Sequence, residues 1–293
     1  MHKEFQKELE RCQRLVDNRL GEFFGEHTSY SELLVSMRYS LLSGGKRIRA
    51  IICMKFCEAV GGKPEAALDA ACAIEMLHTY TLIHDDLPCM DDDDVRRGKP
   101  SNHIQFGEFT ATLAGDAMQA AAFETLLKSD LPPERLVKMA LALAKAAGPY
   151  GICSGQYLDL AGEGMALEAA ELSEINSLKT SALISAAAQI GVIAGGGTLE
   201  QVEAADDYAQ ALGLAFQIRD DVLDCIATEE ALGKPIGSDN ENKKYTYAVL
   251  LGTDECERHI LAETDKAIKA LEREFVQTDF LKTLAIYLAT RQK

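Results

Sequence analysis

Two acid-rich clusters, far apart in the chain, contain the residues whose types and spacing most directly suggest chemistry. The first reads Asp85-Asp86-Leu87-Pro88-Cys89-Met90-Asp91 with three more aspartates behind it, and the second reads Asp220-Asp221-Val222-Leu223-Asp224. Each follows a long apolar pattern typical of a helix, so carboxylates gather at a helix C-terminus, where the dipole is already negative. A cation must compensate this charge. Mg2+ prefers oxygen ligands and completes its octahedron with water and substrate phosphates. The clusters therefore predict a metal-dependent enzyme that acts on a diphosphate.

The second cluster has the simpler spacing. Leu212, Phe216, Asp220 and Asp224 follow one another at i, i+4 and so share one helix face. This face begins apolar and ends acidic. It is the pattern expected of a deep apolar channel with a metal-lined mouth.

The helix before the first cluster carries His78, Thr81 and Asp85 at i, i+3 and i+7, again on one face. Pro88 then breaks the helix, and the bulge it permits could bring Asp91 back beside Asp85. An EF-hand is excluded for the aspartates that follow, because the alternating ligands, central Gly and final Glu are absent. The competing interpretation of such a run is a solvated acidic surface.

Basic residues lie where a polyphosphate would need partners. They form the segments Gly44-Gly45-Lys46-Arg47-Ile48-Arg49 and Arg96-Arg97-Gly98-Lys99. Guanidinium groups fork onto phosphate oxygens, and ammonium groups neutralise them. The first segment lacks the spacing of a P-loop, and either segment alone is equally compatible with a solvent-exposed turn.

Composition narrows the class of protein. The 293 residues are 47% hydrophobic and carry a formal charge of -16, so nucleic acid is not an expected partner. The eight cysteines form no CxxC pair and lie mostly in apolar runs, which indicates reduced core thiols. We find no secretory leader and no uninterrupted apolar run of about 18 residues, so we expect a cytoplasmic protein without a membrane span.

The elements that must position these residues are helices. The chain is rich in Ala, Leu, Glu and Lys and has few alternating β-branched runs, so the predicted fold class is all-α. No linker divides it, and we expect a single domain over 1–293. Gly195-Gly196-Gly197 is interpreted as a helix-helix turn. The predicted helices are 3–20, 30–42, 46–60, 64–86, 103–128, 133–147, 152–160, 168–193, 198–226, 243–251, 254–274 and 278–290.

Taken together, these motifs resemble those of the short-chain trans-isoprenyl diphosphate synthases. The matching segments are GGKRIR at 44–49, LIHDDLPCMDDDDVRRGKPSNH at 82–103, FQIRDDVLDC at 216–225 and GKPIGSD at 233–239. The likeness runs nearly end to end. It implies a prenyl synthase helical bundle with a central apolar cavity, which is usually a homodimer, and two or three Mg2+ ions that hold an allylic diphosphate between the aspartate motifs.

The resemblance also implies roles for individual residues. Direct metal ligands are expected at Asp85, Asp91 and Asp220. Accompanying acids that act through water or orient ligands are expected at Asp86, Asp221 and Asp224. The allylic diphosphate is expected on Arg96, Lys179, Lys234 and Lys244. The diphosphate of isopentenyl diphosphate is expected on Lys46, Arg49, His78 and Arg97. Thr180 and Gln217 match the positions near the reacting carbons. Three residues depart from the family pattern: Ser181, where the family usually has Gly, Tyr245, where a small hydroxyl residue is common, and Ala50, where Pro is frequent.

The implied reaction needs no side-chain nucleophile. Metal ions and cations absorb charge on the departing diphosphate, the allylic C–O bond ionises, and the double bond of isopentenyl diphosphate attacks the carbocation. A proton is then lost, and the released diphosphate is the nearest base. The expected activity is a trans-prenyltransferase of isoprenoid biosynthesis.

The resemblance implies that product length is limited by side chains that form the floor of the apolar channel. These side chains lie just before the first aspartate motif and block the growing prenyl tail. Here they are Tyr80 and Thr81, about 6 to 7.5 Å down a helix from Asp85 at about 1.5 Å per residue. An aromatic residue at 80 with the longer aspartate spacing resembles bacterial farnesyl diphosphate synthases. The Pro-Cys-Met spelling at 88–90 is more typical of some geranylgeranyl synthases. We therefore expect farnesyl diphosphate, with a geranylgeranyl or geranyl product as the alternative.

Two other classes share part of the pattern. A terpene cyclase has an aspartate-rich metal site on a helical fold, but it needs no second diphosphate pocket such as GGKRIR suggests. A non-catalytic regulatory subunit of a prenyl synthase is the other class, although such proteins tend to have lost aspartates and this chain retains both sets.

Overall fold

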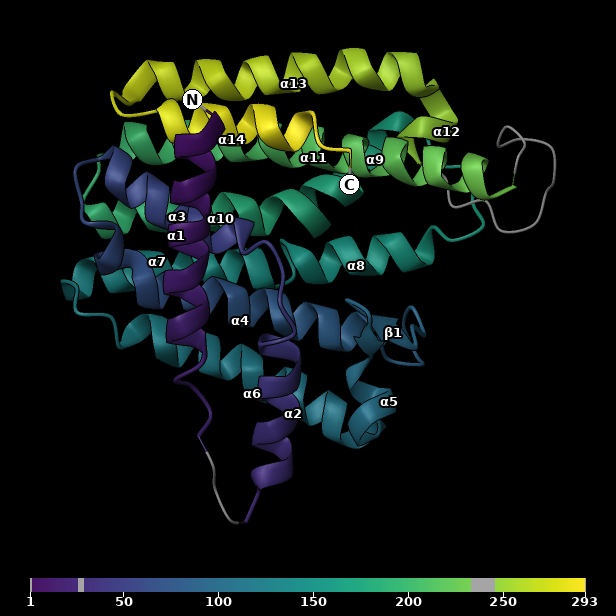
Figure 1. Ribbon diagram of the computed structural model, residues 1–293, viewed down its shortest axis with the longest axis horizontal. Helices are drawn as coiled ribbons and strands as arrows, with labels where there is room; N and C mark the ends of the chain where they lie inside the picture. Colours follow the sequence, from purple (N-terminus) through teal and green to yellow (C-terminus); the bar gives the residue numbers. More distant parts are fainter. Residues whose placement is uncertain (1, 26–28, 233–245, 293) are drawn as a thin grey trace. The chain divides into compact units, whose positions relative to one another are not determined.

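The computed structural model describes residues 2–25, 29–232 and 246–292, which form helices joined by turns and one short hairpin (Figure 1). The elements up to residue 127 are α1 (His2–Leu20), α2 (Ser31–Leu41), α3 (Ile48–Ala59), the 3-10 turn η1 (Pro64–Ala67), α4 (Leu68–Asp85), β1 (Val95–Arg96), β2 (Lys99–Pro100), α5 (Asn102–Phe106) and α6 (Glu108–Leu127). Those that follow are α7 (Pro133–Ala147), α8 (Ile152–Ala161), α9 (Ala169–Asn176), the π-helical η2 (Ser177–Ser181), α10 (Ala182–Gly195), α11 (Leu199–Leu232), α12 (Tyr247–Leu251), α13 (Thr253–Glu274) and α14 (Asp279–Ala289). The fold is all-α, as predicted.

The helices group into two compact units. The first comprises residues 1–143 and 189–197, and the second comprises residues 144–188 and 198–293. The chain passes from the first unit to the second within α7, returns to the first within α10, and enters the second again between Gly197 and Thr198, just before α11. The single domain and the central apolar cavity expected from the sequence remain predictions.

Helix α4 is the centre of the first unit. Residues 70–77 are all buried, because this stretch of α4 is apolar except for Glu75 and is covered by α1, α2, α3 and α6. Figure 1 shows α4 and α6 side by side. Burial of its N-terminal half fixes the direction in which α4 runs, and its last residue is Asp85.

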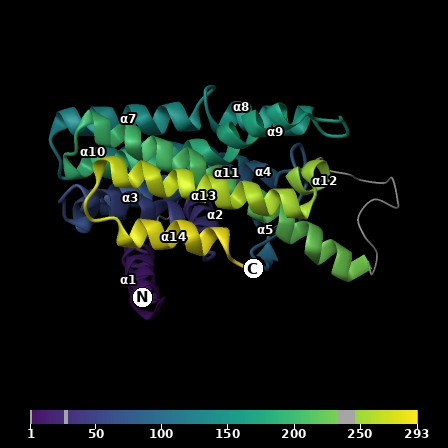
Figure 2. The ribbon, with the colours of Figure 1, turned by 90° about the horizontal axis from the view of Figure 1, so that it is seen from above.

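Helix α11 organises the second unit. Helix α13 runs alongside it, and α14 packs on both (Figure 2). Arg219 on α11 joins the three helices: its guanidinium donates to both carboxylate oxygens of Glu257 at 2.6 Å and, through Nε, to the Ala289 carbonyl at 2.6 Å. This arrangement holds the chain's C-terminal helix against the helix that carries the second aspartate motif.

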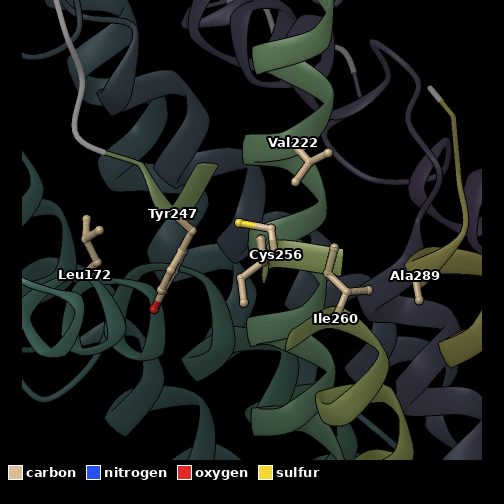
Figure 3. Packing of buried hydrophobic residues seen from close by; sticks show 7 residues of the cluster. Leu172, Val222, Tyr247, Cys256, Ile260 and Ala289 are labelled. Atoms are coloured by element: carbon tan, nitrogen blue, oxygen red, sulfur yellow. The ribbon is translucent and has the colours of Figure 1, made fainter. Parts of the chain in front are cut away.

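An apolar cluster underlies the second aspartate motif. Figure 3 shows side chains of the cluster, which come from α9, α11, α12, α13 and α14. Its members are Leu172, Ile218, Val222, Tyr247, Cys256, Ile260 and Ala289. Because Ile218 and Val222 flank Asp220 and Asp221, this packing fixes the helix turn on which those carboxylates lie.

Several predicted elements differ in detail from the observed ones. The predicted helix 103–128 is two helices, since Gly107 has φ of 85° and separates α5 from α6. The predicted helix 64–86 opens as a 3-10 turn, and 168–193 contains a π-helical turn. The β1–β2 hairpin was not predicted. The turn at the three glycines is confirmed: α10 ends there, and Gly197 N–H donates to Val192 O at 2.9 Å.

Two segments of the structure are more apolar than the sequence-based expectation of no membrane span suggests. Counted by length and composition alone, residues Pro133–Ala161 and Ala169–Gly195 are apolar enough to cross a membrane, with mean hydropathies of 1.2 and 1.3. The second window is 61% buried within the protein, as core helices are. These two segments do not establish a membrane span.

Candidate active site

The first aspartate motif follows the end of α4 as a tight backbone turn. Asp91 N–H donates to the Asp85 carbonyl at 2.9 Å, and both Met90 and Asp92 donate to Leu87 O, at 2.8 and 3.2 Å. The backbone therefore returns Asp91 beside Asp85, which is the bulge that Pro88 was expected to permit.

One carboxylate oxygen of this turn fits a cation. Oδ1 of Asp91 is buried and has no hydrogen-bond partner among the described residues. A buried, unpaired carboxylate oxygen is costly, and a bound cation would remove that cost. Across residues 2–25, 29–232 and 246–292, no three acidic, His or Cys side chains converge into a protein-only metal cage. The partnerless Asp91 Oδ1 can supply one carboxylate ligand to Mg2+, which takes one or two carboxylates and completes its shell with phosphate and water.

Asp86 is held by the hairpin that follows. Arg96, on β1, donates through Nε to Asp86 Oδ1 at 2.8 Å and through Nη2 to Asp93 Oδ2 at 2.9 Å. Burial raises the pKa of Asp86, and the hydrogen bond from Arg96 opposes that rise. Arg96, expected on the allylic diphosphate, is thus already engaged by two carboxylates, with which a diphosphate would compete.

A cationic cluster forms where the glycine-lysine loop meets α4. Arg49 Nη1 lies 3.3 Å from His78 Nε2, and Nε of Arg49 is buried without a partner among the described residues. Arg97 reaches the same loop, donating to the Gly44 carbonyl. Lys46 lies exposed in this loop. Arg49 and His78 are therefore in direct contact, and Lys46 and Arg97 lie at the loop that precedes α3.

The electrostatics of this cluster favour an anion. Burial lowers the pKa of His78 well below its ordinary value, and the charges of Arg49 and Arg97 lower it further. Burial also lowers the pKa of both arginines. The charge of Glu75 raises the pKa of both arginines and so offsets part of this effect, and a diphosphate would supply further negative charge.

Arg47 is a positioning residue that the sequence did not single out from its neighbours. Its side chain is 1% exposed; it donates to Asp17 at 2.9 Å and to the Leu41 carbonyl at 2.7 Å, and lies 3.4 Å from Glu75. It also takes the left-handed φ of 52°. Glu75, an acid in the most apolar stretch of α4, was the signal that a buried cation lay nearby.

In the second unit, a hydrogen-bonded chain links three of the predicted residues. Thr180 Oγ1 donates to Gln217 Oε1 at 3.1 Å, and Gln217 Nε2 donates to Asp221 Oδ1 at 3.1 Å. Asp221 Oδ2 accepts the Tyr247 N–H at 2.9 Å. Burial raises the pKa of Asp221 to about 6, against the opposing hydrogen bonds from Tyr247 and Gln217. Asp221 therefore orients its neighbours.

Lys179 lies in the π-helical turn and is paired with an acid that the sequence did not suggest. Its Nζ donates to Asp159 Oδ2 at 2.6 Å, and the two side chains are 26% and 18% exposed. One turn earlier on α8, both amide atoms of Gln156 are buried without partners among the described residues. The i, i+3 spacing of Gln156 and Asp159 on an otherwise apolar helix was the available signal.

Asp220 is paired with the C-terminal segment. Arg291 Nη2 donates to Asp220 Oδ1, and the guanidinium lies 4.0 Å from the centre of the Phe216 ring. The Arg291 side chain is 9% exposed and that of Asp220 is 36% exposed. Along this face of α11, Leu212 is buried, Phe216 is half-buried and Asp224 is exposed, as the apolar-to-acidic stripe predicts.

The expected chain-length residues lie on the last turns of α4. Tyr80 is half-buried, and its ring meets that of His84 edge-on, with centroids 5.1 Å apart at 81°. Thr81 is also half-buried and donates to the His78 carbonyl at 2.8 Å. The remaining expected ligands, Lys234 and Lys244, lie outside the described residues, as does Tyr245.

Comparisons with known proteins identify the family. The polyprenyl synthetase family model matches residues 31–284. The chain is 45% identical to a farnesyl diphosphate synthase of Geobacillus stearothermophilus over 246 residues, which cover 83% of each chain. It is 48% identical over 225 residues to geranylgeranyl pyrophosphate synthase 11 of Arabidopsis thaliana, covering 75% of this chain but only 63% of the plant protein, less than two thirds of its length.

A solved structure extends the likeness to the fold. The FPP/GFPP synthase of Zymomonas mobilis, in its apo form, superposes with a TM-score of 0.89 at 33% identity and covers 98% of this chain and 100% of that one. The chain therefore belongs to the polyprenyl synthetase family and is a trans-prenyltransferase.

Proposed function

We propose that this trans-prenyltransferase condenses isopentenyl diphosphate with dimethylallyl or geranyl diphosphate and releases mainly farnesyl diphosphate. The observation that carries the proposal is the half-buried ring of Tyr80, supported edge-on by His84, about 7.5 Å along α4 from Asp85. Side-chain volume at that depth limits the length of an apolar tail. The Geobacillus relative is named for the same product.

The proposed metal is Mg2+. Asp85 and Asp91 are its proposed ligands in the first motif, and Asp220 is its proposed ligand in the second. The buried, unpartnered Oδ1 of Asp91 supports this assignment. Bound Mg2+ would supply Lewis-acid neutralisation of the diphosphate that leaves the allylic carbon.

Charged side chains of the chain bind the substrates. Arg49, His78 and Arg97, with Lys46, are proposed to hold the diphosphate of isopentenyl diphosphate, because they form a cationic cluster with an unpartnered buried donor. The allylic diphosphate is proposed to be held by Arg96, Lys179, Lys234 and Lys244. For Lys179, release from Asp159 accompanies that binding.

Thr180 and Gln217 are proposed to lie against the reacting carbons. Their hydroxyl and amide are fixed by the chain of hydrogen bonds that ends on Asp221, so neither group can turn freely toward the carbocation. No nucleophilic side chain is required, since the released diphosphate takes the proton. A homodimer and a cytoplasmic location remain expectations from the family resemblance.

The test is a product assay. Purified protein, Mg2+ and labelled isopentenyl diphosphate are incubated with each allylic diphosphate in turn, and the dephosphorylated alcohols are separated by chain length. Predominant farnesol supports the proposal. Predominant geranylgeraniol favours the alternative suggested by the plant relative's name. Turnover without isopentenyl diphosphate would indicate a cyclase, and activity that requires a second protein would indicate a regulatory subunit.

Variants at Tyr80 test the floor directly. Tyr80→Ala removes the ring and is expected to move the main product from farnesol to geranylgeraniol or longer. Tyr80→Phe keeps the ring volume and is the matched control, expected to leave farnesol predominant. An unchanged product pattern in Tyr80→Ala would contradict the role of this side chain.

A further inference from the structure

The imidazole of His84 lies between Tyr80, one turn earlier on α4, and the neighbouring helix α6. Its Nε2–H donates to the Thr112 carbonyl of α6 at 3.0 Å, and its ring supports the Tyr80 ring edge-on at 5.1 Å. Asp116 of α6 lies close by, with Oδ1 3.8 Å from Nε2. His84 therefore connects the side chain proposed to stop the growing tail with a helix that carries none of the sequence motifs.

Gly115 is what lets this imidazole approach α6. A Cβ added at residue 115 would lie 3.0 Å from Cε1 of His84 and closer still to Nε2 and Cδ2. Gly115 is buried within α6, where glycine is less favourable than alanine. A glycine in a helix interior usually has a packing reason. Here the reason is the space that the His84 ring occupies.

We propose that His84 and Gly115 determine product length by fixing the position of Tyr80. The proposal rests on the proposed function, because it assumes that Tyr80 limits the prenyl chain. His84 is a positioning residue: it acts through Tyr80, and Gly115 acts through His84. The specificity of the enzyme is then set by a contact between α4 and α6, in addition to the residues immediately before the first aspartate motif.

The two residues have opposite expected effects. Gly115→Ala displaces the imidazole from α6 toward Tyr80, so the space for the tail shrinks and the share of shorter prenyl alcohols rises. His84→Ala removes the support beside Tyr80, so the ring can move aside and longer alcohols gain. The energy needed to force a side chain such as His84 or Tyr80 off its preferred rotamer corresponds to a roughly two- to tenfold change in the ratio of shorter to longer prenyl alcohols.

The experiment is a double-mutant cycle read as the ratio of product lengths. The variants are Gly115→Ala, His84→Ala and the double variant, with Tyr80→Ala as the positive control. Leu20→Ala, which truncates a fully buried side chain of α1, is the control for general loss of packing. Thermal unfolding is measured alongside, because a purely structural role would change stability without changing the product ratio.

The expected result is that Gly115→Ala shifts the ratio in the wild-type background and has no further effect once His84 is alanine. Leu20→Ala lowers stability and leaves the ratio unchanged. An equal effect of Gly115→Ala in both backgrounds, or none while Tyr80→Ala does change the product, overturns the proposal and leaves the proposed function intact. No change in Tyr80→Ala overturns the floor assignment and, with it, the role of His84.

Discussion

Replacing Arg291 by Gln tests whether a side chain at the C-terminus serves as the counter-ion of Asp220 when metal is absent. The Arg291 guanidinium bonds Asp220 and lies over the Phe216 ring. A metal ion that takes Asp220 as a ligand competes for the same carboxylate. We expect the metal ion to displace Arg291 or to be repelled by its charge, and either cost subtracts from the metal's affinity.

The size of this cost follows from the exposure of the pair. The Arg291 side chain is 9% exposed and that of Asp220 is 36% exposed, so the pair lies between a solvated surface and the interior. A fully exposed ion pair contributes about 0–1 kcal/mol, and a hydrogen bond to a charged group about 1.5–3 kcal/mol. An intermediate value of about 1–2 kcal/mol corresponds to roughly 5- to 30-fold in metal affinity.

The assay measures Mn2+ binding to the metal-free protein. Binding is monitored as the loss of the electron paramagnetic resonance signal of free Mn2+. Lys282→Gln is the matched control: it removes the same charge from α14, where Lys282 pairs with Glu272 at 2.7 Å. We expect Arg291→Gln to bind Mn2+ about 5- to 30-fold more tightly than wild type and Lys282→Gln to match wild type. Equal or weaker binding by Arg291→Gln would refute the competition.

Three further predictions concern groups in the second unit. Burial raises the pKa of Asp221 from 3.8 to about 6. The stabilising contribution of Asp221, about 3 kcal/mol at about 1.4 kcal/mol per pKa unit, is therefore complete below pH 4 and is lost as pH rises through 6. Urea unfolding in EDTA should show that Asp221→Asn flattens the dependence of the unfolding free energy on pH over this window, and an unchanged slope would count against this prediction. Lys179→Met removes the 2.6 Å ion pair with Asp159, so we expect it to destabilise the fold by about 1–3 kcal/mol and to raise KM for the allylic diphosphate. Adding Asp159→Asn should restore stability but not KM. Recovery of both would show that Lys179 does not bind substrate. A Cβ at Gly213 would lie 2.8 Å from Cβ of Ser181, so Gly213→Ala should lower the free energy of unfolding by about 1–3 kcal/mol. Chemical denaturation should show that Ser181→Gly recovers most of this lost stability. A failure of that rescue would mean that another contact causes the loss.

The sequence predicted the helices well because their signals are local. Periodicity, glycines and prolines mark most of the ends, and the face of α11 from Leu212 to Asp224 follows directly from i, i+4 spacing. The hairpin was missed because its strands are only two residues each, too short for an alternation to be detected. Its Arg97-Gly98 turn, with φ of 54° and 74°, was the remaining signal.

The site was predicted by residue type, and its partners were not. Asp85 and Asp91 are close in sequence, so a proline-broken turn was enough to foresee their approach. Arg291 and Asp220 are separated by 71 residues, and Lys179 and Asp159 by 20. Such pairings depend on how helices pack, because side chains far apart in sequence meet only through tertiary contacts. For the same reason, Gly115 could not be linked to His84 from the sequence.

The π-helical turn at Ser177–Ser181 limits how this part of the gene can vary. A π-turn holds one residue more than the α-helical path, and an α-helix advances about 100° per residue. Losing a single codon here would restore regular helix and rotate α9, turning the buried Leu172 and Ile175 out of their packing. Lys179 and Thr180 therefore lie in a segment that can drift by substitution, while its length is fixed.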